Sequence, residues 1–133
     1  MSFQALYAIS SQSMFTQDVR INLVAGNLAN AEVAANSENA VFQSQDVVMT
    51  STRVENSFGV MVSEIVKNNK PANVRYQPDH PLANDEGQVF YPAIDTVEQV
   101  AAMMSSARSF ETAVSLFSTG RHMQDRVVDL INL

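Results

Sequence analysis

The chain contains no cysteine, and it has only four glycines and four prolines among its 133 residues. Without cysteine there can be no disulfide, thiolate nucleophile or thiolate metal site. With four scattered glycines, neither a P-loop nor a G-x-G-x-x-G fingerprint can be written. No serine lies in a G-x-S-x-G or S-x-x-K motif. We therefore predict that the chain is not an enzyme and has no catalytic residue and no cofactor.

Basic residues are also scarce, because eight Lys and Arg stand against fourteen Asp and Glu, for a net charge of -6. Such a surface repels phosphate backbones and anionic lipid, so we expect no nucleic-acid partner. The first residues have no basic start, and their apolar run is broken at residues 10–13. We expect neither a cleaved signal peptide nor a membrane span.

Metal-ligand patterns are missing as well. His80 and His122 lie in different segments, and no H-x-x-x-H spacing occurs. Asp79, Asp85 and Glu86 gather in one loop, but they do not follow the spacing of a calcium-binding EF-hand loop. We interpret this loop as a polar turn, and we predict no metal site.

A long amphipathic helix is predicted at the N-terminus, over about residues 3–31. Four apolar residues recur at intervals of seven, namely Tyr7, Met14, Ile21 and Leu28. The alternate positions of the heptad hold Ser10, Gln17, Val24 and Ala31, so this seam is only half apolar. A lone helix with such a face is marginally stable in water, and it therefore needs a partner.

A second helix of about 35 residues is predicted from Asp95 to the C-terminus. Asp95 can cap the first turn and Glu98 can reach back to it, which would complete a capping box. No proline follows Asp95, and one internal glycine, Gly120, weakens the helix by about 1 kcal/mol relative to alanine. The apolar residues form two adjacent stripes: Met103, Ala107, Phe110, Val114, Phe117, Val128 and Ile131, and beside them Met123, Val127 and Leu130.

The middle of the chain is predicted to be a small antiparallel sheet that follows a loop at residues 34–40. Residues 84–87, Asn-Asp-Glu-Gly, indicate a hairpin turn. The expected strands contain the β-branched and aromatic runs at 41–42, 47–49, 60–62, 65–66, 74–76 and 89–91.

These elements predict an α+β fold in which the two long terminal helices pair as an antiparallel coiled coil around a small antiparallel β section. The predicted organisation is a discontinuous helical domain, residues 1–33 and 94–133, and a central loop and β-rich segment, residues 34–93. The two helices carry more apolar surface than their own contact needs. We therefore expect contacts with other copies of the chain.

Four segments resemble the bacterial flagellar axial proteins, and among them the rod proteins of the C type. Residues 20–31, with Gly-Asn-Leu-Ala-Asn at 26–30, are similar to the N-N-L-A-N signature of that family. Residues 81–95 resemble its N-P-L-A…G-x-V…P-x-V-D pattern, residues 59–66 its central strand, and residues 104–111 its M-x-x-S-R-S-Y stretch. The chain departs from the family at residues 32–42, which replace a Thr-Pro-Gly-Tyr stretch.

The resemblance implies a structural subunit of the proximal rod of the flagellar basal body, which transmits torque for motility. It implies type III export without leader cleavage, a periplasmic position, and partners among other copies and other rod proteins. We expect the assembly interface to contain Tyr7, Met14, Ile21, Val24, Asn27, Leu28, Ala29, Asn30, Met104, Arg108, Phe110, Val114 and Phe117.

Three alternatives remain open at this point. One is a coiled-coil adaptor or regulator that forms a closed oligomer, and another is a different short rod protein with the same terminal signatures. The block from residue 81 to residue 95 favours the C type. A third alternative, an enzyme acting on the cell wall, would need a cleft with convergent acidic residues.

Overall fold

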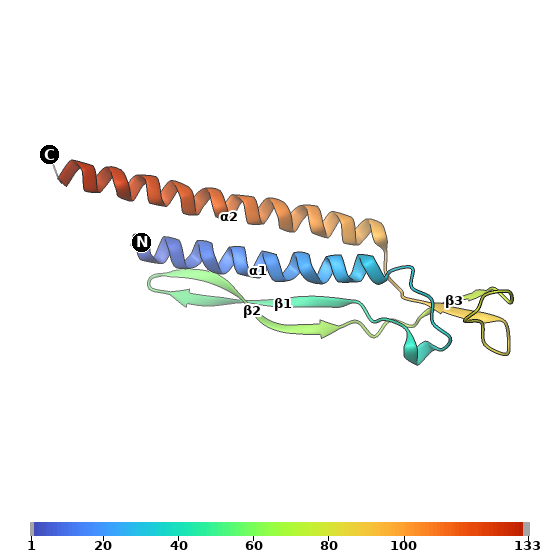
Figure 1. Cartoon of the computed structure of the whole chain (residues 1–133). Coiled ribbons are helices and arrows are strands. Elements are labelled where there is room, and N and C mark those ends of the chain that lie inside the picture. Colours follow the sequence, from blue (N-terminus) through green and yellow to red (C-terminus); the bar gives the residue numbers. More distant parts are fainter. Residues whose placement is uncertain (1, 132–133) are drawn as a thin grey trace.

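The computed structural model describes residues 2–131, which form an elongated molecule with both ends of the chain at the same side (Figure 1). The elements in chain order are α1 (Phe3–Asn30), the 3-10 turn η1 (Glu38–Ala40), β1 (Gln45–Val54), β2 (Ser57–Lys67), β3 (Asn73–Tyr76), β4 (Gln88–Tyr91) and α2 (Thr96–Ile131). The α+β class is confirmed.

Both helices begin at a side-chain cap. The Ser2 hydroxyl accepts a hydrogen bond from the Ala5 N–H (3.0 Å) at the start of α1. At the start of α2, Asp95 Oδ1 accepts hydrogen bonds from the N–H groups of Val97 (2.9 Å) and Glu98 (3.3 Å). Among the described residues, the Glu98 side chain makes no hydrogen bond back to Asp95, and it is exposed. The last two residues of the predicted second helix, 132–133, lie outside the described range.

The two helices lie side by side and antiparallel, as predicted. Near the start of α1, the ring of Tyr7 packs against Phe117 with centroids 5.0 Å apart, and its hydroxyl donates to Gln124 Oε1 (2.7 Å). Near the end of α1, Asn27 Nδ2 donates to Gln99 Oε1 (3.0 Å), close to the start of α2. Early residues of one helix thus meet late residues of the other. Whether the pair follows coiled-coil geometry stays a prediction.

Small side chains on α2 bring the helices close together. The buried residues of α2 are Ser106, Ala113 and Gly120, which are spaced by seven. A Cβ atom added at Gly120 would lie 2.6 Å from Leu6 Cδ2, so the side chain of α1 occupies the space that glycine leaves open. The glycine that weakens α2 as a helix therefore serves the packing of the pair.

The hairpin β1–β2 lies along α1, so that α1 runs between this hairpin and α2 (Figure 1). The strands are antiparallel, with a register shift between Val48 and Met49. The hydroxyl of Thr16 on α1 donates to the Val60 carbonyl oxygen (3.3 Å), and Gly59 is buried where Gln12 approaches it. Packing on α1 gives this two-stranded ribbon the support that an isolated hairpin lacks in water.

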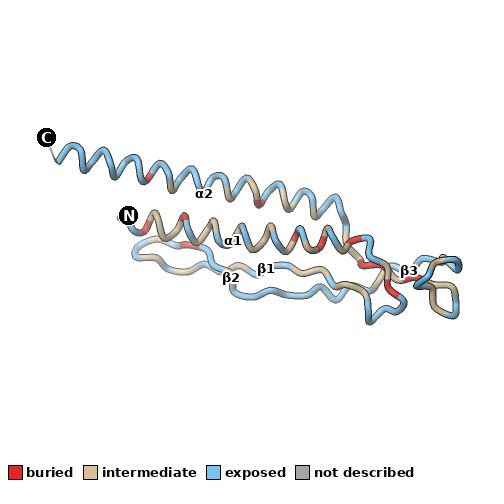
Figure 2. The backbone as a smooth tube through the Cα atoms, viewed as in Figure 1, coloured by how far each residue is buried: buried red, intermediate tan, exposed pale blue. Residues whose placement is uncertain are grey.

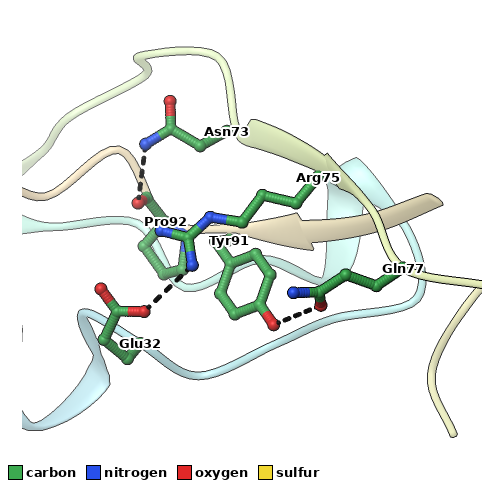
Figure 3. A network of polar contacts seen from close by, with 6 residues as sticks. All are labelled: Glu32, Asn73, Arg75, Gln77, Tyr91 and Pro92. Carbon is green, nitrogen blue, oxygen red and sulfur yellow. Dashed lines mark hydrogen bonds and ion pairs between the residues drawn. The ribbon is translucent and has the colours of Figure 1, made fainter. Parts of the chain in front are cut away.

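The second hairpin, β3–β4, stands at the end of the molecule away from the chain termini (Figure 1). Ala35 forms a bridge to Phe90 through two backbone hydrogen bonds of 2.8 and 3.0 Å. The Arg75 guanidinium lies over the Tyr91 ring, 4.4 Å from its centroid, and Arg75 Nη1 is 3.4 Å from Glu32 Oε2 (Figure 3). These contacts tie the hairpin to the loop after α1.

Three expectations for the middle of the chain need correction. Residues 41–42 are not a strand, because the chain there only connects η1 to β1. β1 runs on to Val54 through the polar segment 50–53, which the apolar pattern did not include. The β section is two separate two-stranded sheets, β1–β2 and β3–β4, rather than one. The turn at residues 84–87 is confirmed, with Gly87 at a φ of 73°.

The fully or nearly buried residues are few and mostly small. They gather along α1 and around β4, and α2 is pale blue over most of its length in Figure 2. Every residue from 121 to 131 of α2 is exposed. The monomer therefore has a narrow core around α1 and leaves much apolar surface open to solvent.

Candidate assembly surfaces on the helix pair

No side-chain cluster suited to metal chemistry occurs in the part of the chain that the structure describes. Residues 2–131 contain no group of three or more His, Asp or Glu that could hold a metal ion. His80 Nδ1 accepts a hydrogen bond from the Leu82 N–H (3.1 Å), so this histidine stabilises its own turn. None of the described helices combines the length and the apolar character that a membrane span needs. The surfaces left to consider are the helix faces.

Two of the interface residues predicted on α1 lie inside the monomer. Val24 and Asn27 are 5% and 3% exposed. Asn27 joins three elements, because its Nδ2 donates to the Gln45 carbonyl oxygen (2.8 Å) and to Gln99 Oε1 (3.0 Å), while its Oδ1 accepts from the Gln45 N–H (2.8 Å). The amide pairs with the first residue of β1 as a neighbouring strand would. In this conformation Asn27 therefore holds together elements of its own subunit.

The remaining predicted interface residues of α1 differ in how far they are exposed. Tyr7 packs against Phe117, and Asn30 Nδ2 donates to the Gly26 carbonyl oxygen (2.8 Å) within the helix. Ala29 is exposed, and the half-buried residues are Tyr7, Met14, Ile21, Leu28 and Asn30. Ala29 is thus the predicted α1 residue most open to a neighbouring molecule.

The predicted residues of α2 divide into an inner and an outer group. Phe110 and Phe117 are half-buried, and Phe117 contacts Tyr7 of α1. Met104 (55% exposed), Val114 (42%) and the exposed Arg108 form the outer group. The outer group is free to meet another molecule.

Several exposed apolar residues were not among the predicted interface residues. Phe15 of α1 is 64% exposed, and Val97 and Val100 of α2 are exposed beside Met104. Val97 and Met104 are seven residues apart, and this spacing was a signal that could have found them. The late residues of α2 add more open apolar surface: Met123, Val127, Val128, Leu130 and Ile131.

Comparisons with known proteins connect this architecture to a family. No family model matches the chain. The chain is 26% identical over 132 residues to "Flagellar basal-body rod protein FlgC" of Escherichia coli O6:H1, and the alignment covers 98% of each chain. The chain is thus similar to a flagellar rod protein from one end to the other. The same protein of Salmonella typhimurium is also 26% identical over 98% of each chain, and that of Buchnera aphidicola from Schizaphis graminum is 29% identical over 127 residues.

The resemblance predicted from the sequence is thereby confirmed. The FlgC relatives align from end to end, so the similarity includes both helices and both hairpins and is not confined to one short motif. The names of these relatives describe basal-body rod proteins and no enzymatic activity, in agreement with the prediction of a chain that is not an enzyme.

Proposed function

We propose that this chain is a structural subunit of the proximal rod of the bacterial flagellar basal body. The observation that carries the proposal is the end-to-end similarity to FlgC, which covers 98% of this chain and 98% of the relatives. In this role the subunit polymerises with other copies and with other rod proteins, and the assembled rod transmits torque for motility.

The open apolar faces of the helix pair support this function. α1 is covered by α2 and by β1–β2, whereas the outer side of α2 bears exposed valine, methionine and leucine side chains. Removing such a face from water contributes about 25 cal/mol per Å² of apolar surface. We infer that the pair adopts coiled-coil geometry in the rod and that neighbouring subunits cover its outer side.

The predicted interface residues would act in two ways within such an assembly. Ala29, Met104, Arg108 and Val114 would touch neighbouring molecules, because they are exposed in the single chain. The buried and half-buried members would hold the helix pair in the shape that the neighbours meet; they are Tyr7, Met14, Ile21, Val24, Asn27, Leu28, Asn30, Phe110 and Phe117. Residues 1–33 and 94–133 would then form the helical domain of the rod subunit, and residues 34–93 its outer part.

The proposed location is the periplasmic section of the basal body. We infer export by the flagellar type III apparatus without cleavage of a signal peptide. No nucleic-acid contact belongs to this role, in keeping with the net charge of -6.

A clean deletion in the bacterium that encodes the chain tests the proposal. We expect loss of swimming, restored by the gene in trans, and purified basal bodies with membrane rings but without a complete rod. Normal swimming, or basal bodies with intact rods, would count against the proposal. A soluble closed oligomer together with normal motility would favour a coiled-coil adaptor instead.

Point substitutions test the role of the helices. We expect Leu28→Asp and Phe110→Asp to abolish incorporation into the rod, because each places a charge on the face that joins the helices. The β1–β2 hairpin should remain detectable by amide exchange in these variants. As a control, the same charge at an exposed site in the turn between β1 and β2, Asn56→Asp, should leave incorporation unchanged.

A further inference from the structure

One aromatic side chain projects from the open side of α1. Phe15 is the single large apolar residue of α1 that is exposed in the described structure, at 64%. The neighbouring exposed positions of α1 are polar or small: Gln4, Ser11, Asp18, Asn22, Ala25 and Ala29. Asp18, one turn after Phe15, carries the only charge on this face. A bulky apolar side chain that projects among polar and small side chains can act as the knob of a knobs-into-holes contact with another helix.

A hollow that such a knob could enter lies on the side of α2 that faces away from α1. Ala101, Met104, Ser105 and Arg108 follow the i, i+3, i+4, i+7 spacing that forms a hole in knobs-into-holes packing, and together with Ser109 they line an open hollow. Ala101 and the two serines leave the space, Met104 supplies apolar contact, and Arg108 brings one positive charge to the rim.

The knob and the hole are on different sides of the molecule. The residues of α2 that face α1 are Ser106, Ala113 and Gly120, and Ala101 and Arg108 are about half a turn away from them around the helix. Phe15 belongs to the side of α1 that neither α2 nor β1–β2 covers. The knob of one chain therefore cannot fill the hole of the same chain.

We propose that Phe15 of one copy inserts into the hollow formed by Ala101, Met104, Ser105 and Arg108 of a second copy. Asp18 then lies one helical turn from the inserted ring, within reach of Arg108 of that copy, so the charge beside the knob and the one charged residue that lines the hollow have opposite signs. The guanidinium can also contact the face of the phenyl ring. The inference rests on the proposed function, because it names the two faces through which copies meet.

This contact joins two different surfaces, so it is heterologous. Each copy presents one knob and one hole on different sides, and each added copy offers a free knob or hole to the next. Such an interface forms an open series or a ring, unlike an isologous dimer that closes on itself. A series suits a subunit of a polymeric rod.

The absence of native cysteine makes a direct test simple. A chain with both Asp18→Cys and Arg108→Cys is expressed in the deletion strain, and basal bodies are oxidised and analysed on a non-reducing gel. We expect a ladder of disulfide-linked oligomers, because each chain would link to a neighbour on either side. In the matched control, Ser118→Cys replaces Arg108→Cys at another exposed site of α2, and no ladder should form. Adding Phe15→Ala to the first pair should reduce the ladder by about tenfold, in line with the ~1.4 kcal/mol that corresponds to a factor of ten.

A charge reversal gives a second readout. Asp18→Arg and Arg108→Asp should each lower the yield of rods, and the double exchange should restore it, while the melting temperature of the isolated chain stays unchanged because both sites are exposed. Complete rods without a ladder, or an equal ladder from the Ser118→Cys control, would overturn the inference and leave the proposed function standing. An absence of rods in the unaltered strain would instead contradict the proposed function.

Discussion

The two long helices of this molecule are alike in sequence pattern and unlike in surroundings. α1 has five buried residues among 28, and it is covered on one side by α2 and on another by β1–β2. α2 has three buried residues among 36, all of them small, and the other sides of this helix are open to solvent. α1 is the centre of the core, and α2 is held to it along one seam.

This difference indicates which helix stabilises the monomer and which surface is available to other molecules. Substitutions of the buried residues of α1 should act mainly on the free energy of unfolding of the isolated chain. Substitutions on the outer side of α2 should act mainly on assembly, because few of those side chains contact the rest of the subunit. Four pairs of variants test this division and the contacts on which it rests.

The largest expected effect comes from introducing aspartate at two valines, one buried and one exposed. Val24→Asp in α1 should lower the free energy of unfolding by about 4 kcal/mol or more, because the carboxylate would be buried without a partner. Val114→Asp in α2 should change it by less than about 0.5 kcal/mol, since the site is already half open. Urea unfolding followed by circular dichroism measures both values. Equal losses in the two variants would remove the distinction between the helices.

A smaller loss is expected at the asparagine that joins three elements. Asn27→Ala would leave the N–H and the carbonyl oxygen of Gln45 without partners, at a cost of about 2–3 kcal/mol. The Gln45 amide proton should exchange faster in this variant. Asn22→Ala, the same change at an exposed site of α1, should leave stability within about 0.5 kcal/mol and the Gln45 amide protected. Unchanged exchange at Gln45 in Asn27→Ala would show that the amide is not held by this side chain.

Alanine substitutions at two glycines should differ by about 1 kcal/mol in their effect on the free energy of unfolding. Gly26→Ala in α1 should stabilise the chain by about that amount, because nothing lies within 4 Å of the added Cβ and alanine favours the helix. Gly120→Ala in α2 gains the same helix propensity, but Leu6 must move away from the new methyl group, so we expect almost no net change. Thermal unfolding measures both variants. A gain at Gly120 equal to that at Gly26 would mean that the helices are not closely packed there.

The smallest effect is expected at the exposed end of the contact between α1 and α2. Tyr7→Phe removes the hydrogen bond to Gln124 and retains the ring contact with Phe117, so the loss should be about 0.5 kcal/mol. Gln124→Met removes the same bond from the other side. The double variant should lose no more than the larger single loss, and a full sum of the two losses in a double-mutant cycle would argue against the bond.

Features that depend on neighbouring residues in the chain were accessible from the sequence. The seven-residue spacing from Tyr7 to Leu28 predicted α1, and Asp95 marked the start of α2 within one residue. The turn at 84–87 was also predictable, because the Asn84 side chain accepts hydrogen bonds from its own loop, and Gly87 adopts the positive φ that glycine tolerates.

Features that depend on distant residues were not accessible in the same way. The polar segment 50–53 became strand because it pairs with residues 58–61 of β2, a partner that no local pattern reveals. Residues 41–42 have strand-forming side chains but no strand to pair with, and they remained a connection. The domain division predicted at residues 34 and 94 was not tested, although β1–β2 packs closely on α1.

By itself, the sequence determined the two long helices, their amphipathic faces, the absence of common catalytic and metal motifs, and the likeness to rod proteins, because these follow from local spacing and composition. The tertiary structure alone decided that Asn27 faces inward, that Gly120 admits Leu6, and that Phe15 and the hollow at Ala101 and Arg108 stay open on different sides. The physical reason is that helical periodicity defines which residues share a face. Only the packing of one element on another determines which of those faces is covered.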